Sequence, residues 1–196
     1  TGSLGRIAEA IGLVTGSTVN VAAGTYAEKV FVGKSVTLRG AQAGIDARGR
    51  TGSPESVISP NEAYCVVVQA DNVTIDGFEI TSDWATNSDV AGIYVSDNIG
   101  QPGEGGTELS GIVIKNTIIH DLTDGLRTGG QGIQGIVVGP KTDGVELAYN
   151  EIRNLHMIDD SYSYAPVGIM IWGNPGGQEA KNTNIHHNLV HTIEND

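Results

Sequence analysis

The amino-acid sequence predicts an all-β protein in which short strands stack in parallel into a solenoid. Three observations support this prediction. One apolar pattern recurs four times without gaps, a second strand-like pattern alternates with it, and both patterns are rich in Ile and Val and bounded by glycine. A single repeat is too small to bury its own apolar side, so consecutive repeats must stack to form a continuous core.

The first pattern is carried by four segments that align along their whole length. They are NVTIDGFEIT (72–81), GIVIKNTIIHDL (111–122), GVELAYNEIRNL (144–155) and NTNIHHNLVHTI (182–193). Their first strong apolar residues are Ile75, Ile114, Leu147 and Ile185, and the next at a fixed offset are Ile80, Ile119, Ile152 and Val190. Leu122, Leu155 and Ile193 occupy a third matching position. The shared offsets predict that each set stacks as one column.

The second pattern lies between copies of the first. Its segments are CVVVQA (65–70), GIYVSD (92–97), GIVVGP (135–140) and GIMIWG (168–173). Their matching residues are Val68, Val95, Val138 and Ile171. Successive side chains of a strand point to opposite faces. We therefore expect these residues to face the core, and Tyr94, Val137 and Met170 to face outward.

Two other repeat architectures have a comparable period of 33 to 39 residues. Helical repeats are disfavoured because the segments carry β-branched residues and glycine and lack helical spacing. A β-propeller needs four strands per blade, whereas each unit here contains two or three.

The GIxV segments, together with the Leu147–Ile152 and Ile185–Val190 stretches, resemble the pectin-lyase-like superfamily. STVNVAAGTYAEKVFVGKSVTLRGA (17–41) is similar to the opening rung of many secreted β-helix proteins, including pectin methylesterases. The resemblance covers about residues 17–193. It implies a single-stranded right-handed parallel β-helix of about five rungs, a rung being one full turn, within one domain spanning 1–196. Because this fold hosts lyases, hydrolases, esterases, epimerases and inert adhesins, it does not fix a function.

The two ends of the predicted solenoid differ. Residues 3–14 (SLGRIAEAIGLV) place apolar residues on one helical face, so we expect a short capping α-helix that closes the N-terminal end of the core. No matching cap follows the strand pattern at 182–193. We therefore expect an end that is truncated or open and that would allow end-to-end self-association through the C-terminal rung.

Composition narrows the classes of partner. The net charge of −12, from 23 acidic and 11 basic residues, argues against binding nucleic acid or anionic lipid. No apolar run is long enough for membrane insertion. Cys65, the single cysteine, is predicted to be a buried, inert thiol. No signal peptide is visible in the chain, and the predicted extracellular or cell-surface location follows from the resemblance alone.

The three histidines near the C-terminus suggest a site or a structural repeat. The alignment places His120, Arg153 and His191 in one exposed polar column. His186 and His187 are adjacent, so they should diverge if the strand is regular, which disfavours a shared metal. Asn150 and Asn188 are expected to form turns and to bond to the backbone or to each other in a ladder.

Candidate functional residues gather in the loops that precede the GIxV strands, 81–91, 120–134 and 155–166. Equivalent loops of stacked rungs lie side by side, so these should flank the outward face of the GIxV strands. They carry the acidic residues Asp83, Asp89, Asp121, Asp124, Asp159 and Asp160, and the basic residues His120, Arg127 and His156. The aromatic residues Trp84, Tyr162 and Tyr164 of these loops, with Tyr94 and Trp172 from the strands, are predicted to bind substrate.

Two catalytic schemes are compatible with these residues. In a calcium-dependent lyase or epimerase of an acidic polysaccharide, Ca²⁺ held by Asp121, Asp159 and Asp160 would acidify a uronate proton. Arg127 would remove that proton or clamp the substrate, with His120 and Asp124 completing the catalytic group. In a hydrolase, two carboxylates would flank the glycosidic bond, either Asp121 with Asp124 or Asp159 with Asp89.

Two other functions need no catalysis. The same aromatic residues could stack on sugar rings of a polysaccharide that is bound but not cleaved. The alternative to a carbohydrate-interacting protein is a non-catalytic surface, adhesin-like or filament-forming scaffold. Esterase activity is rejected because the resemblance to pectin methylesterases implies two aspartates and an arginine on successive central strands, whereas the GIxV strands offer Asp97 but no matching second Asp or Arg. The glycine-rich segment 96–110 lacks the lysine and helix that a phosphate-binding loop requires.

Overall fold

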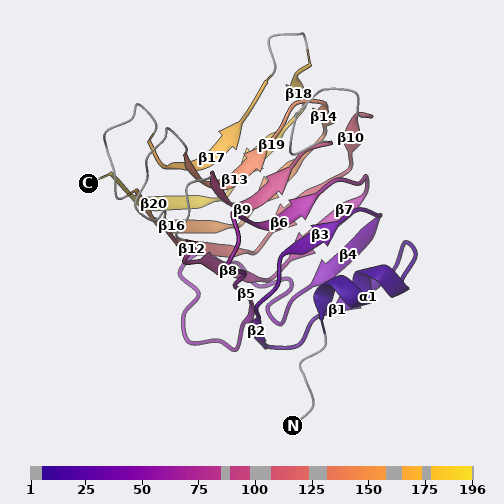
Figure 1. Ribbon diagram of the computed structural model, residues 1–196, viewed down its shortest axis with the longest axis horizontal. Helices are drawn as coiled ribbons and strands as arrows, with labels where there is room; N and C mark the ends of the chain where they lie inside the picture. Colours follow the sequence, from indigo (N-terminus) through magenta and orange to yellow (C-terminus); the bar gives the residue numbers. More distant parts are fainter. Residues whose placement is uncertain are drawn as a thin grey trace.

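The computed structural model is a parallel β-solenoid with one short helix at its N-terminal end (Figure 1). It describes residues 6–84, 89–97, 107–123, 132–157, 165–173 and 178–195. Three long sheets of six, six and five described strands run along the solenoid, and the chain visits them in the same order in successive rungs. Strands pair only with their counterparts in neighbouring rungs, and every pair in these sheets is parallel.

The three long sheets are named A, B and C in the order in which the chain visits them. Sheet A contains β1 (Thr18–Asn20), β4 (Val36–Arg39), β7 (Val73–Asp76), β11 (Val113–Lys115), β15 (Glu146–Ala148) and β19 (Asn184–His186). Sheet B contains β2 (Gly24–Tyr26), β5 (Ser56–Ile58), β8 (Glu79–Ser82), β12 (Ile118–Thr123), β16 (Glu151–Met157) and β20 (Leu189–Asn195). Sheet C contains β3 (Val30–Val32), β6 (Tyr64–Val68), β9 (Val90–Val95), β13 (Ile133–Val138) and β17 (Val167–Ile171). A small fourth sheet joins β10 (Leu109–Ser110), β14 (Thr142–Asp143) and β18 (Ala180–Lys181).

The predicted repeat register is confirmed. Ile114 pairs with Ile75 in one direction and with Leu147 in the other, and Leu147 pairs with Ile185. The columns built on Ile119 and on Val138 follow the alignment in the same way. A slip of one residue would turn every apolar side chain of a strand toward solvent, so the apolar pattern fixes this register.

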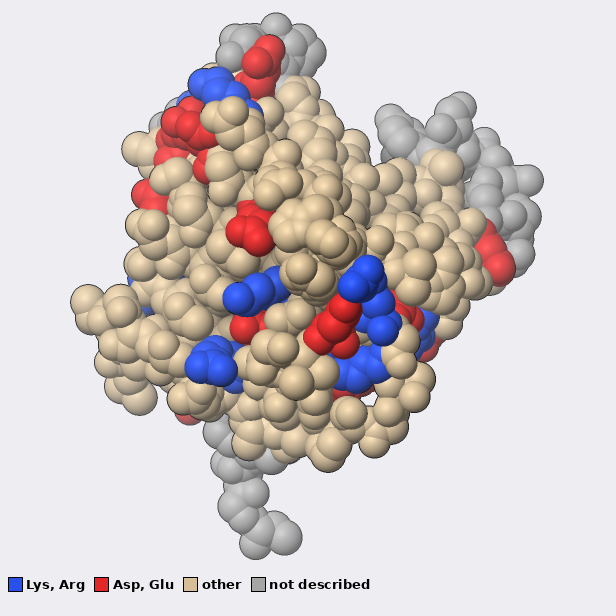
Figure 2. Space-filling view, turned by 180° about the vertical axis from the view of Figure 1, so that it is seen from behind, with Lys and Arg blue, Asp and Glu red and all other residues tan. Residues whose placement is uncertain are grey.

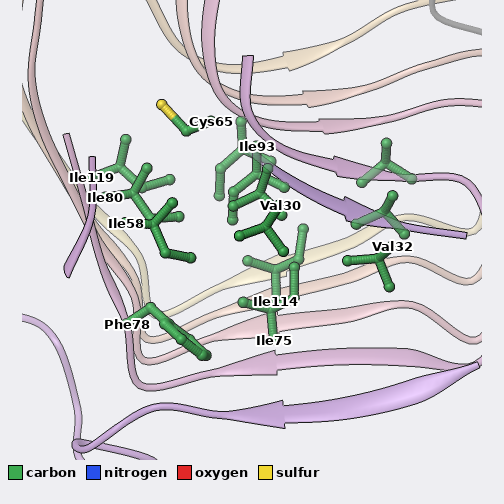
Figure 3. Close-up of a cluster of buried hydrophobic side chains, with 14 of the residues drawn as sticks. Val30, Val32, Ile58, Cys65, Ile75, Phe78, Ile80, Ile93, Ile114 and Ile119 are labelled. Atoms are coloured by element: carbon green, nitrogen blue, oxygen red, sulfur yellow. The ribbon is translucent and has the colours of Figure 1, made fainter. Parts of the chain in front are cut away.

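Stacked aliphatic side chains form the core (Figure 3). Ile58, Ile80 and Ile119 form one column from sheet B, and Ile75 and Ile114 form another from sheet A. Each of these five residues is almost inaccessible to solvent. Since complete burial of one such side chain stabilises the folded state by about 1.5–3 kcal/mol, the ladders are the main source of stability. Cys65 is buried, as predicted.

The glycine of each GIxV motif lies where sheet C approaches sheet B. A Cβ atom on Gly135 would lie 2.5 Å from the carbonyl oxygen of Gly168 and 2.6 Å from Cγ2 of Ile152. A Cβ on Gly168 would lie 2.4 Å from Cγ1 of Val190. These glycines therefore permit close packing between two sheets, in addition to ending a loop.

The corner between sheets A and B contains a column of residues with left-handed backbone. Gly77, Asn116, Tyr149 and His187 have φ angles of 79°, 53°, 56° and 54°. The prediction that His186 and His187 diverge was wrong, because the positive φ of His187 breaks the alternation of a regular strand. Their Nδ1 atoms lie 2.8 Å apart.

An asparagine ladder lies next to this corner, as expected. The Asn150 side-chain amide donates to Oδ1 of Asn188 (2.9 Å) and to the carbonyl of Ile114 (3.0 Å). Asn150 Oδ1 accepts a hydrogen bond from the backbone N–H of Thr117. The ladder thus satisfies buried polar groups where the chain passes from one sheet to the next.

Residues 41–55 form a strap across the same corner, which nothing in the sequence had indicated. Arg50 in this strap is buried and forms a two-point ion pair with Glu55. Its guanidinium also donates to the carbonyl oxygens of Ile45 and Asn116. The contact with Asn116 attaches the strap to a rung that is distant in sequence.

The N-terminal helix α1 (Ile7–Leu13) is shorter than the predicted segment 3–14, whose first residues lie outside the described part. Ile7 and Ile11 belong to the core cluster, and α1 packs against β3. Glu28 accepts hydrogen bonds from the N–H groups of Ile7 and Ala8, and Lys34 donates to the carbonyls of Gly12 and Val14. The first rung therefore caps both ends of the helix.

Inward-facing residues become accessible in the last described rung. Ile185 and Val190, which continue the core columns, are 44% and 42% exposed. Their counterparts one rung earlier, Leu147 and Ile152, are fully buried.

Candidate functional site

The outward side of sheet C carries a column of large side chains. Tyr94, Val137 and Met170 are paired in register, and the column continues through Val67 to Phe31. Ala91, Tyr94 and Val137 form a buried cluster separate from the main core. The predicted alternation is therefore correct, and sheet C has an apolar surface on each side.

A pocket of about 310 Å³ opens on this outward side. It is lined by Asp89, Tyr94, Gly132, Gln134, Val137, Met170 and Trp172. Asp89 is held in place by a hydrogen bond from the backbone N–H of Gly132 to its Oδ1, at 2.8 Å. The pocket combines two aromatic rings, two aliphatic side chains, one carboxylate and one amide. None of its described lining residues is Lys or Arg.

Aromatic rings extend the apolar surface beside the pocket. The ring centroids of Tyr64 and Tyr94 are 5.2 Å apart, and the ammonium group of Lys29 lies 5.5 Å from the centre of the Tyr64 ring. Burial raises the pKa of both phenols, and the nearby Asp89 carboxylate raises them further. Both phenols are therefore neutral at physiological pH and retain a hydroxyl that can donate a hydrogen bond.

His120 and Asp121 lie on sheet B, within β12, instead of in a loop. His120 Nδ1 is 2.6 Å from Asp121 Oδ2, and its Nε2 is 3.0 Å from Glu79 Oε1. Burial lowers the pKa of His120, but its bonds to Glu79 and Asp121 outweigh that effect and raise it. Both ring nitrogens are thus engaged, which leaves no free nitrogen for a general base.

The carboxylate of Asp121 is engaged on both oxygens. The second oxygen accepts a hydrogen bond from the Asn154 side-chain amide at 2.9 Å. Burial raises the pKa of Asp121, yet the bonds from Asn154 and His120 outweigh that effect and lower it. This carboxylate stabilises the outer surface of sheet B and is poorly placed to release an oxygen to Ca²⁺.

The rest of the predicted polar column continues along sheet B. His120, Arg153 and His191 pair in register as the alignment predicts. Arg153 Nε donates to Glu151 Oε1 at 2.8 Å, and His191 Nε2 lies 3.5 Å from the same oxygen. The other oxygen of Glu151 accepts a hydrogen bond from Gly49 in the strap. The column is therefore an ion-pair network that links rungs and the strap.

The structure separates the predicted site residues. Tyr94 and Trp172 line the same pocket, whereas Trp84 packs against the main core and His120 and Asp121 lie on another sheet. Gln134 was missed, because regular alternation from Ile136 and Val138 turns it inward, whereas it lines the outward pocket. Arg127, Asp124, Asp159, Asp160, Tyr162 and Tyr164 lie outside the described residues. Within the described ranges, no group of three or more His, Cys, Asp or Glu side chains is arranged to hold a metal ion.

Other hollows offer less chemistry. One, of about 490 Å³, lies at the corner of the first two rungs and is lined mainly by small residues, with Asn20 and Arg39. Another, of about 270 Å³, borders Asp121, His156 and Glu194 on sheet B. Neither contains an aromatic ring besides the imidazole of His156. The pocket on sheet C is therefore the better candidate despite its smaller volume.

Surface charge marks no binding site among the described residues on the face drawn in Figure 2. Acidic and basic side chains adjoin each other there instead of forming one continuous patch.

No protein family matches this chain, and neither a curated protein nor a solved structure is significantly similar to it. The solenoid fold therefore rests on strand register. The described part contains no helix with the length and apolar character of a membrane span.

Proposed function

We propose that this protein is a β-solenoid scaffold that binds a polysaccharide on the outward side of sheet C, at an extracellular or cell-surface location. The pocket that joins Tyr94 and Trp172 to Asp89 and Gln134 carries this proposal. Aromatic faces stack on the apolar faces of sugar rings, and carboxylate and amide groups bond to hydroxyls. Trp172 is 39% exposed, so its ring is accessible to a ligand.

Calcium-dependent lyase or epimerase activity on an acidic polysaccharide stays a prediction. Among its residues in the described part, His120 and Asp121 are committed to each other and to Glu79 and Asn154. The activity therefore depends on Arg127 and on the aspartates Asp124, Asp159 and Asp160. Incubation with polyuronates and Ca²⁺, followed by ultraviolet absorbance of the unsaturated product, tests it. An Arg127→Ala variant with the same rate as the unmodified protein would remove Arg127 from the scheme.

A purely structural scaffold that associates end to end is the second candidate. The exposed inward residues Ile185 and Val190 on the last rung favour it. Sedimentation at increasing protein concentration tests this candidate, with Val190→Lys as the variant that should prevent association. A strictly monomeric protein at all concentrations would rule out self-association through this rung.

Binding is measured by tryptophan fluorescence against a panel of soluble neutral, amino-sugar and uronate polysaccharides. The chain has two tryptophans, so a Trp84→Phe background leaves Trp172 as the single reporter at the pocket. We expect a saturable change in its emission with at least one class of polymer. Since the described pocket presents a carboxylate and no cation, neutral and amino-sugar polymers should bind more tightly than uronates.

The control variant is Phe31→Ala, because Phe31 is also an exposed aromatic residue in the same outward column, 49% accessible, but lies outside the pocket. Affinity electrophoresis should show that Trp172→Ala loses about tenfold or more in affinity while Phe31→Ala binds normally. Equal binding by both variants, or no binding to any polymer, would refute the proposal.

A further inference from the structure

His186 and His187 form a pair of converging imidazoles at the corner between sheets A and B. Their Nδ1 atoms are 2.8 Å apart and their rings are nearly perpendicular, at 88°. The φ angle of 54° at His187 produces this arrangement by turning its side chain back toward His186. His187 is exposed and His186 is partly exposed, so an ion can reach both nitrogens.

Neighbouring groups hold both rings. Nε2 of His186 lies 3.3 Å from Oε1 of Glu146, and His187 stacks on Tyr149 with centroids 4.9 Å apart. The side-chain amide of Asn188 donates to the carbonyl of His186 and so fixes the backbone of the corner. A carboxylate on the distal nitrogen of a histidine is the usual partner that orients a metal-binding imidazole.

The spacing of the nitrogens discriminates between metal geometries. Imidazole nitrogens bind first-row ions at about 2.0–2.1 Å, so two of them lie about 2.9 Å apart at a right angle and about 3.4 Å apart at a tetrahedral angle. The observed 2.8 Å fits the right angle. Square-planar or tetragonal coordination by nitrogen is typical of Cu²⁺ and Ni²⁺, whereas Zn²⁺ prefers a tetrahedron.

We propose that the Nδ1 atoms of His186 and His187 chelate a Cu²⁺ or Ni²⁺ ion, with Glu146 orienting His186 from its distal nitrogen. The remaining coordination positions are left to water or to a group of a partner. The formal charge of −12 favours a cation. The guanidinium of Arg48, which lies 5.4 Å from the centre of the Tyr149 ring, is paired with Asp46 at 2.6 Å. The site is independent of the polysaccharide pocket on sheet C.

The repeat provides variants that remove each ligand with little change to the fold. His187→Asn introduces the residue found two rungs earlier at the same corner, Asn116, with φ of 53°. His186→Ala introduces the residue paired with it one rung earlier, Ala148. His191→Arg, which copies its register partner Arg153, is the control for a single exposed histidine.

Calorimetric titration with CuSO₄ tests the proposal, with electron paramagnetic resonance to count coordinated nitrogens. We expect one equivalent of Cu²⁺ bound through two nitrogens, weaker binding of Zn²⁺, and a rise in melting temperature on adding Cu²⁺. His187→Asn and His186→Ala should each reduce Cu²⁺ affinity at least about tenfold, while His191→Arg should not.

Two results would overturn the proposal. Cu²⁺ binding of the same affinity in both ligand variants would place the ion elsewhere, for example at the terminal amine. No binding in the unmodified protein would show that the short nitrogen–nitrogen contact is a hydrogen bond between the rings. Melting curves without metal verify that each variant is folded, so a loss of affinity cannot be mistaken for unfolding.

Discussion

Replacing a residue of the buried Arg50–Glu55 ion pair tests how much the strap contributes to stability. Arg50 Nε lies 2.7 Å from Glu55 Oε1, and only 4% and 8% of the two side chains are exposed. Replacing Arg50 by Met keeps most of the aliphatic volume but leaves the Glu55 carboxylate buried without its partner. The carbonyls of Ile45 and Asn116 lose a donor as well, at 2.8 Å and 3.1 Å.

The expected loss follows from these contacts. Removal of one partner of a buried ion pair costs about 3–5 kcal/mol, and each carbonyl left without a donor adds up to about 1–3 kcal/mol unless water replaces it. We therefore expect Arg50→Met to lose at least about 3 kcal/mol in free energy of unfolding. This is a large share of the ~5–15 kcal/mol available to a typical domain.

Urea unfolding followed by circular dichroism measures the loss, and the strap contains its own control. Arg48 pairs with Asp46 at 2.6 Å, but these side chains are 36% and 41% exposed. Such a surface pair contributes about 0–1 kcal/mol, so Arg48→Met should be nearly neutral. Since Arg50→Met removes much of the stability, the milder Arg50→Lys variant keeps the measurement possible.

A double variant completes the cycle. Replacing both Arg50 and Glu55 by Met removes the unpaired charge, so it should be more stable than Arg50→Met alone. The reasoning is refuted if Arg50→Met and Arg48→Met lose the same stability, or if the double variant is less stable than Arg50→Met.

Three further predictions follow from contacts in the core and on sheet B. Because the pKa of His120 is raised in the folded state, its contribution to stability is complete below the unfolded pKa of about 6.5 and is lost as pH rises through the folded pKa. The free energy of unfolding, measured across this pH range, should therefore fall in the unmodified protein but not in His120→Gln. Gly135→Ala should destabilise by about 1–3 kcal/mol through overpacking, whereas Gly12→Ala, with open space in α1, should be neutral or stabilising in the same urea assay. Burial raises the pKa of the Cys65 thiol to about 12, so it should react with a thiol reagent only after unfolding, and rapid reaction of the native protein would contradict its burial.

Most of the fold was predictable because the spacing of apolar residues in the sequence determines which of them stack in the core columns. Ile114 has the same offset from its neighbours as Ile75 and Leu147, and stacking is the only way to bury all three. The role of Gly135 was only half predictable. The sequence indicates a loop end, whereas the contact with Ile152 depends on the distance between sheets C and B.

The strap was not predictable, since its contacts join residues far apart in the chain and outside the repeat. Arg50 reaches the carbonyl of Asn116 across 66 positions, and no residue in the repeat alignment marks that carbonyl as an acceptor. In contrast, the conformation of His187 could have been inferred. Its column begins with Gly77 and Asn116, two residue types that adopt positive φ readily.

The residues of the candidate site were predictable where they belong to regular strands and not where they belong to loops. Tyr94 belongs to β9 and Trp172 directly follows β17, so alternation and register determine which side of sheet C they occupy. Arg127 and Asp124 belong to a segment with no counterpart in the core columns, and apolar spacing therefore imposes no direction on their side chains. His120 shows the consequence: counted both in the aligned segment 111–122 and in the loop 120–134, it lies in β12 because Ile119 and Leu122 on either side of it are core residues. The apolar residues that flank a polar one are thus the better guide to its position, and they favour Tyr94 and Trp172 over His120 as ligand-binding residues.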